Sequence, residues 1–143
     1  MPVRLPRALA VVALASSLAA CGGHSASPEN VARAWSKAIN AGDNEAAGDL
    51  FARGARVVQQ SGVIRLHTHA DAVAWNAALP CSGRIVAVKA RSDTATVTFR
   101  LGDRPTSRCD GPGATVRALF LVHDGKIVLW HQLAGTTAPG QPV

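Results

Sequence analysis

The sequence predicts an α+β domain in which N-terminal helices pack on one face of a curved antiparallel sheet. Apolar residues recur with helical spacing in the chain that follows residue 27, and most of the chain after residue 57 is typical of strands. Helices that precede the strands, rather than alternating with them, are typical of an antiparallel sheet covered on one face. The length of 143 residues suits one domain. The 48% of apolar residues excludes a disordered chain.

Two helices are expected at the start of the domain. Ser27 and Pro28 provide an N-cap and a first helical residue, and the helix that they begin should stop near residues 40–42. Asp43 should cap a second helix that ends at Arg53 and Gly54. The apolar side chains at helical spacing are Val31, Trp35, Ala38 and Ile39 in the first helix, and Ala46, Ala47, Leu50 and Phe51 in the second.

The remainder of the domain is typical of strands with one short helix between them. Asp71 is expected to cap this helix, and Pro80 should end it. Asp124-Gly125 is typical of a two-residue hairpin turn. A sheet of this kind curves around the first helix and leaves a concavity at its open end. The expected strands are 57–60, 63–69, 83–89, 94–101, 114–123 and 126–133.

Residues 1–20 have the features of a secretory signal peptide. Basic residues precede an apolar run that is too short to span a membrane and that ends in small residues. The ending Leu18-Ala19-Ala20-Cys21 resembles the lipobox of bacterial lipoproteins, whose cysteine is acylated after cleavage. We therefore expect a lipid anchor at Cys21 on the extracytoplasmic face of the cell membrane, a flexible tether within 21–27, a domain at 28–133 and a disordered tail at 134–143. The alternative is an ordinary secretory signal with Cys21 as a free thiol.

The mature chain is only mildly basic. The formal net charge is +6 for the whole sequence, and loss of Arg4 and Arg7 with the signal peptide lowers it to +4. No run of basic residues follows the signal, and the tryptophans are not interleaved with arginine. These features argue against a nucleic-acid partner.

Two of the three cysteines are expected to form a disulfide. With Cys21 assigned to the lipid, Cys81 and Cys109 remain as an even number in an oxidising compartment. Their spacing fits no redox or zinc motif. A bridge between them would add about 3.6 kcal/mol of stability in the chain-entropy model. The alternative is two free thiols.

Two segments resemble the nuclear transport factor 2-like (SnoaL-like) superfamily. Val31-x-x-x-Trp35-x-x-Ala38-Ile39-Asn40-Ala41-Gly42-Asp43-x-x-Ala46, with Leu50-Phe51-Ala52 after it, is similar to the superfamily's opening helices. Phe120-x-x-x-Asp124-Gly125-Lys126-Ile127-x-x-Trp130 is similar to its closing hairpin. The resemblance covers residues 28–133 and implies a cystatin-like α+β cone with a hydrophobic pocket. Members include polyketide cyclases, ketosteroid isomerases, epoxide hydrolases, scytalone dehydratases and non-catalytic binding or dimerisation modules, so the fold alone does not define the function.

The enzymes of this superfamily use pocket carboxylates, often with tyrosine or histidine partners. All nine acidic residues are expected in caps, turns or a polar helix face, and the chain has no tyrosine. The candidate acid/base groups are therefore His67 and His69, which would share one face of a strand, and His131. A metal would need His123 or His131 as a third ligand, and no carboxylate or cysteine has a compatible spacing. No metal and no other cofactor is expected.

Three tryptophans are candidates for a ligand-binding wall. Trp35, Trp75 and Trp130 come from the first helix, the short helix and the last strand, which approach one another in the superfamily's architecture. They are either core residues or an aromatic wall for an apolar ligand, which His67 or His131 would orient. Arg100 and Arg117 are alternatives for an anionic ligand, although solvent-facing strand positions explain them equally well.

We therefore expect a non-catalytic, lipid-anchored module that binds a small apolar ligand or an envelope protein partner. One alternative is a pocket enzyme of the isomerase, dehydratase or cyclase type, with His67, His69 or His131 as acid/base. It requires a histidine that converges with an acid or an arginine in a closed pocket. The other alternative is a homodimerisation or scaffold domain that uses the outer face of the sheet.

Overall fold

The computed structural model describes residues 25–60 and 62–134. The expected signal peptide, Cys21, the first residues of the tether and the tail beyond Ala134 lie outside the described residues. No helix within the described ranges has the length and apolar character needed to cross a bilayer. The elements in these ranges are α1 (Pro28–Ala41), α2 (Asn44–Asp49), β1 (Phe51–Gln59), β2 (Gly62–Leu66), α3 (His69–Ala78), β3 (Ser82–Arg91), β4 (Thr94–Gly102), β5 (Thr115–His123) and β6 (Lys126–Leu133).

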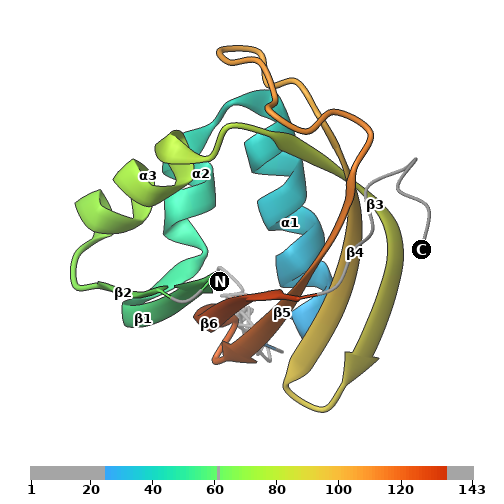
Figure 1. Cartoon of the computed structure of the whole chain (residues 1–143). Helices are drawn as coiled ribbons and strands as arrows, with labels where there is room; N and C mark the ends of the chain where they lie inside the picture. Colours follow the sequence, from blue (N-terminus) through green and yellow to red (C-terminus); the bar gives the residue numbers. More distant parts are fainter. Residues whose placement is uncertain (1–24, 61, 135–143) are drawn as a thin grey trace, which may run out of the picture.

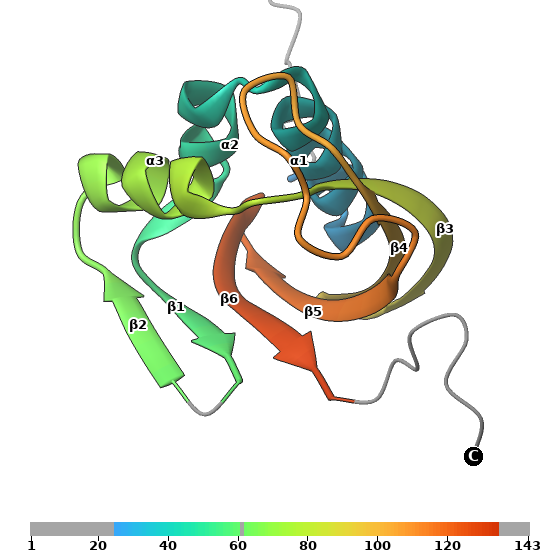
Figure 2. The same cartoon turned by 45° about the horizontal axis from the view of Figure 1, so that its top comes forward.

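The strands form one curved sheet with the order β2-β1-β6-β5-β4-β3. The sheet wraps around α1, which lies along its concave side, while α2 and α3 lie together at one side of the molecule (Figure 1). Figure 2 shows how β3, β4 and β5 curve around α1. This arrangement confirms the predicted α+β cone with helices on one face of the sheet.

One strand pairing differs from the predicted antiparallel sheet. β1 and β6 run parallel, with Val57 opposite Trp130, whereas every other pair in the described sheet is antiparallel. The sheet is therefore mixed. No turn signal could reveal this pair, because β1 and β6 lie at opposite ends of the domain sequence and no hairpin joins them.

Helix α1 begins and ends at the predicted residues. The Ser27 hydroxyl accepts a hydrogen bond from the Asn30 backbone N–H (3.2 Å), and Gly42 ends the helix with a φ of 73°. The apolar stripe of α1 is buried against the inward-facing side chains of β4 and β5. These inward-facing residues are Ala95, Val97 and Phe99 in β4, and Ala118, Phe120 and Val122 in β5.

The second helix is shorter than predicted. It ends at Asp49, and Phe51 is the first residue of β1 rather than part of a buried helix face. The Ile127 N–H donates to the Leu50 carbonyl (2.8 Å), and Phe51 is opposite Ile127, so pairing with β6 draws this segment into the sheet. Ala47 and Phe51 are buried as the apolar pattern indicated, whereas Ala46 is exposed.

The segment around His67 also differs from the prediction. β2 ends at Leu66, and α3 begins at His69 with Thr68, not Asp71, as its N-cap. The Thr68 hydroxyl accepts from the Asp71 N–H (3.1 Å), and Asp71 accepts in return from the backbone N–H groups of Thr68 and His67 (2.9 Å each). Hydrogen bonding to Thr68, above all to its backbone, lowers the pKa of the Asp71 carboxyl. This capping box replaces the predicted end of the strand, so His67 and His69 do not share a strand face.

Candidate ligand-binding pocket

A pocket of about 310 Å³ opens at one end of the curved sheet. Its walls come from the ends of β1, β4 and β6 and the beginnings of β3 and β5. Residues 79–81, which connect α3 to β3, and Asp110, from the loop between β4 and β5, also line it. This pocket occupies the concavity that a curved antiparallel sheet was expected to leave. Its volume is at the lower end of the range for small-molecule sites.

The floor of the pocket is aromatic. Trp35, Phe99 and Trp130 line it, and the Trp35 ring centre lies 5.9 Å from that of Phe99 and 6.0 Å from that of Trp130. Trp75 packs behind this floor, with its ring centre 5.1 Å from that of Trp130, and is not one of the lining residues. The structure therefore brings the three tryptophans together as part of the core. Only Trp35 and Trp130 are placed to touch a ligand in this pocket, and their role as binding residues stays a prediction.

Two glutamines form a polar wall that the sequence interpretation missed. Gln59 and Gln132 line the pocket, and the register that places Val58 opposite His131 makes them neighbours on β1 and β6. The Gln59 side-chain oxygen accepts a hydrogen bond from the Trp75 indole N–H (3.0 Å). An indole N–H can only donate, so this bond fixes the orientation of the Gln59 amide and leaves its NH₂ group as a donor. Gln59 and Gln132 each follow an inward-facing residue, Val57 and Trp130, by two positions. Because side chains alternate along a strand, this spacing could have predicted that both glutamines face inward.

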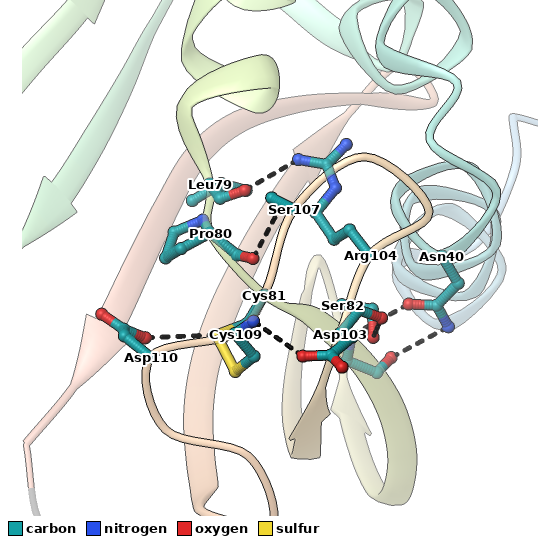
Figure 3. Close-up of a disulfide and its surroundings, with 11 residues drawn as sticks. Asn40, Leu79, Pro80, Cys81, Ser82, Asp103, Arg104, Ser107, Cys109 and Asp110 are labelled. Carbon is teal, nitrogen blue, oxygen red and sulfur yellow. Dashed lines mark hydrogen bonds between the residues drawn. A yellow bond between two sulfur atoms is a disulfide. The ribbon is translucent and has the colours of Figure 1, made fainter.

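The rim of the pocket is held by the Cys81–Cys109 disulfide, which confirms the predicted pair. The bridge joins the start of β3 to the loop that follows β4 (Figure 3). The Asp103 carboxylate accepts from the Cys109 N–H (2.8 Å), and the Ser107 hydroxyl donates to the Pro80 carbonyl (3.0 Å). These bonds fix the loop against the segment that forms the rim.

Arg104 fastens the same loop to the helices. Arg104 as a whole residue is 5% exposed, and its guanidinium donates to the carbonyls of Asn76 (2.7 Å) and Leu79 (2.9 Å) and to the side-chain oxygen of Asn44 (2.6 Å). Burial lowers the pKa of this guanidinium, because desolvation disfavours the charged form. Asn76 and Leu79 lie at the C-terminal end of α3, where the helix dipole favours a cation. Arg104 therefore acts as a helix cap that also positions the rim.

The acidic residue at the rim was not predicted there. Asp110 was expected in a turn and not in a pocket wall; it does lie in a loop, and the disulfide brings this loop to the lining, with the Asp110 oxygen 3.3 Å from the Cys81 sulfur. A bridged sulfur has no proton, so this distance is a contact and not a hydrogen bond. For the same reason Cys81, Cys109 and Asp110, although close together, offer no thiolate to a metal.

The histidines in the described part of the chain lie outside this pocket. His67 and His69 are exposed near the start of α3, and His69 Nε2 lies 2.8 Å from an Asp49 oxygen. His131 follows Trp130 on β6 and is opposite Leu119, so strand alternation directs it to the outer face. Neither of the predicted polar contacts, His67 or His131, meets the aromatic floor.

The two strand arginines, Arg100 and Arg117, face solvent. This was one of the two predicted roles for them, the other being to bind an anionic ligand. Arg100 is exposed and does not line the pocket. Arg117 is exposed and lies at the pocket wall, but its neighbours Val116 and Ala118 face inward, so alternation directs its side chain to the opposite face. The pocket interior thus contains aromatic rings and amides rather than a cation.

No family model matches this sequence, and no curated protein matches it. Many solved structures share the fold. A nuclear transport factor 2-like protein of unknown function from Cytophaga hutchinsonii matches 75% of this chain and 88% of its own, at 9% identity and a TM-score of 0.62. A SnoaL-like protein of unknown function from Burkholderia thailandensis matches 76% of this chain and 95% of its own, at 20% identity and a TM-score of 0.56. A protein with a ketosteroid isomerase-like fold from Catenulispora acidiphila, in complex with trimethylamine, matches 79% of this chain and 90% of its own, at 16% identity and a TM-score of 0.61.

These similarities confirm the predicted fold. The chain has the architecture of the nuclear transport factor 2-like and SnoaL-like proteins, a cone with a pocket at its open end. Identities of 9–20% establish this architecture and not an activity.

Proposed function

We propose that this protein is a lipid-anchored, extracytoplasmic module that binds a small, mainly apolar ligand without chemical conversion. The observation that carries the proposal is the pocket of about 310 Å³ with its floor of Trp35, Phe99 and Trp130. Apolar walls with a few polar groups are typical of small-molecule sites. The neighbour from Catenulispora acidiphila, in complex with trimethylamine, is a protein of this fold that binds a small molecule.

The pocket offers little support for the enzyme alternative. A general acid or base must reach the reacting atom, directly or through one water molecule. None of the histidines in residues 25–60 and 62–134 lines the pocket, and Asp110 is exposed at its rim. His69 has an acidic partner in Asp49, but both side chains are at least half exposed, at 50% and 70%. Binding is therefore the function that this pocket supports best.

A titration with N-phenyl-1-naphthylamine, a neutral apolar fluorophore, tests the binding proposal. We expect Val116→Phe, which places a larger side chain in the pocket wall, to weaken binding about tenfold by steric exclusion. Thr115→Phe is the matched control, because Thr115 lies opposite Arg100 and points to the other face of the sheet. Its affinity should stay within about twofold of the wild type. Equal affinities for wild type and V116F would contradict the proposal and favour an envelope partner instead.

The first described residues, on the side of the chain from which the proposed anchor would extend, lie at the end of the domain away from the pocket. Residues 25–28 lie against the turns at Ser92–Asp93 and Asp124–Gly125, whereas the pocket opens at the opposite strand ends. An acylated Cys21 would thus hold the pocket mouth towards the aqueous side. We expect Cys21→Ala to release the protein from the membrane fraction and to abolish incorporation of labelled palmitate. If C21A carried no palmitate label but remained in the membrane fraction, the lipid anchor at Cys21 would be overturned. The ligand proposal would be unaffected.

A further inference from the structure

The three tryptophans of the aromatic cluster differ in the hydrogen bonding of their indole N–H groups. The Trp35 N–H donates to the Asn76 side-chain oxygen (2.8 Å), and the Trp75 N–H donates to the Gln59 side-chain oxygen (3.0 Å). The Trp130 N–H is buried and has no acceptor among the described residues. A buried donor without a partner costs about 1–3 kcal/mol, and native proteins contain few of them. Two of the three indoles are therefore satisfied by the fold, and the third requires an explanation.

Trp130 is also the residue of this cluster that links the aromatic floor of the pocket to its polar wall. It lines the pocket, and it precedes by two residues Gln132, which lies beside Gln59 on the same inner face. The Gln59 amide is fixed with its oxygen towards Trp75, so it presents its NH₂ group as a donor. This part of the pocket therefore contains two N–H donors, the Gln59 NH₂ group and the Trp130 indole, and the Trp130 N–H is without an acceptor among the described residues.

The charges around the pocket select against an anionic ligand. A carboxylate transferred from water into an apolar site needs a counter-charge to offset its desolvation. Arg104 already donates to three oxygens of the protein, Arg117 points to the outer face, and Asp110 places a negative charge at the rim. An uncharged oxygen acceptor meets the donors without this desolvation cost.

We propose that the pocket binds an uncharged carbonyl compound whose oxygen accepts a hydrogen bond from the indole N–H of Trp130. The apolar body of the ligand packs on Trp35 and Phe99. This inference rests on the proposed binding function and adds to it the chemical class of the ligand and the residue that selects it.

Two probes of nearly identical shape test this inference with the purified protein. 2-Acetylnaphthalene carries a C=O group where 2-isopropenylnaphthalene carries C=CH₂. We expect the ketone to bind about tenfold more tightly, the effect of one hydrogen bond to a donor that is otherwise unpaired. Trp130→Phe should remove this preference, so that the ketone and the alkene bind to the variant with equal affinities. Trp35→Phe is the matched control: it lines the same pocket, but its N–H already bonds to Asn76, so the preference for the ketone should persist.

The wild-type protein provides a second measurement that does not depend on the folding of a variant. Its three tryptophans give three indole ¹⁵N–¹H signals, which triple-resonance experiments on the wild type assign. The ketone should move the Trp130 signal downfield, whereas the alkene should not.

The outcomes separate the two proposals. If neither naphthalene binds, the binding function itself fails. If both bind equally and the Trp130 signal is unchanged by the ketone, the binding function stands and the carbonyl inference is overturned. A ketone preference that survives W130F would overturn the role of Trp130 as the selecting donor.

Discussion

Replacement of both Cys81 and Cys109 by alanine should lower the free energy of unfolding by about 3.6 kcal/mol. The bridge spans a sequence separation of 28 residues, and its loss restores the conformational freedom of that loop in the unfolded chain. For a domain of this size, whose total stability is about 5–15 kcal/mol, the change is large. Urea denaturation of wild type and double variant, followed by tryptophan fluorescence, measures it directly.

Chemical reduction provides the control for this prediction. Dithiothreitol should destabilise the wild type by a similar amount and should leave C81A/C109A unaffected, because the double variant has no bridge to lose. The residues beside the bridge line the pocket, so reduction should also weaken binding of N-phenyl-1-naphthylamine. An oxidised and a reduced wild type of equal stability would contradict the entropic contribution assigned to the bridge.

Replacement of Arg104 by methionine should lower the free energy of unfolding by about 3 kcal/mol. Two effects oppose each other in this substitution. Methionine removes the cost of burying a charge, a cost that also lowers the pKa of the guanidinium. However, it leaves the carbonyls of Asn76 and Leu79 and the side-chain oxygen of Asn44 without their donor. We expect the loss of hydrogen bonds to outweigh the gain from removing a buried charge. The substitution replaces only the donor, so the three oxygen acceptors stay without a partner.

Arg104→Lys is the comparison that separates charge from geometry. Lysine keeps the positive charge near the C-terminal end of α3, but its ammonium cannot span three oxygens as the guanidinium fork does. Its stability should therefore fall between those of the wild type and R104M in the same urea titration. If R104M were as stable as the wild type, the desolvation cost would outweigh the hydrogen bonds, and Arg104 would not be the cap that fixes the rim.

Local sequence signals correctly predicted those helix and strand ends that are formed by residues close together in the chain. Ser27, Pro28 and Gly42 set the limits of α1, and Asp124-Gly125 set the hairpin between β5 and β6, because caps and tight turns are formed within a few residues. The same local reasoning was wrong at Phe51. There the backbone of the segment pairs with Ile127, and that partner lies far away in the sequence.

The candidate site was only partly predictable. The resemblance to the superfamily implied that the elements carrying Trp35 and Trp130 would approach each other, and the two rings do meet in the core. The histidines gave no such signal, and two of the three predicted positions depended on the wrong end of a strand at residues 67–69. Gln59 and Gln132 become neighbours only through the parallel β1–β6 pair. Asp110 reaches the rim through a loop that the disulfide and the hydrogen bonds of Arg104 and Ser107 hold in place.

The sequence alone determined the class of fold, the principal apolar core residues and the cysteine pair. Hydrophobic periodicity and capping residues depend on interactions within a few residues, so the sequence shows them directly. The core residues are predictable because large apolar side chains are buried away from water. The tertiary structure decided which polar groups face the pocket and which indole lacks an acceptor, as Trp130 does. Those properties depend on strand register and on contacts between distant segments, where a shift of one residue exchanges Trp130 for His131 on the inner face.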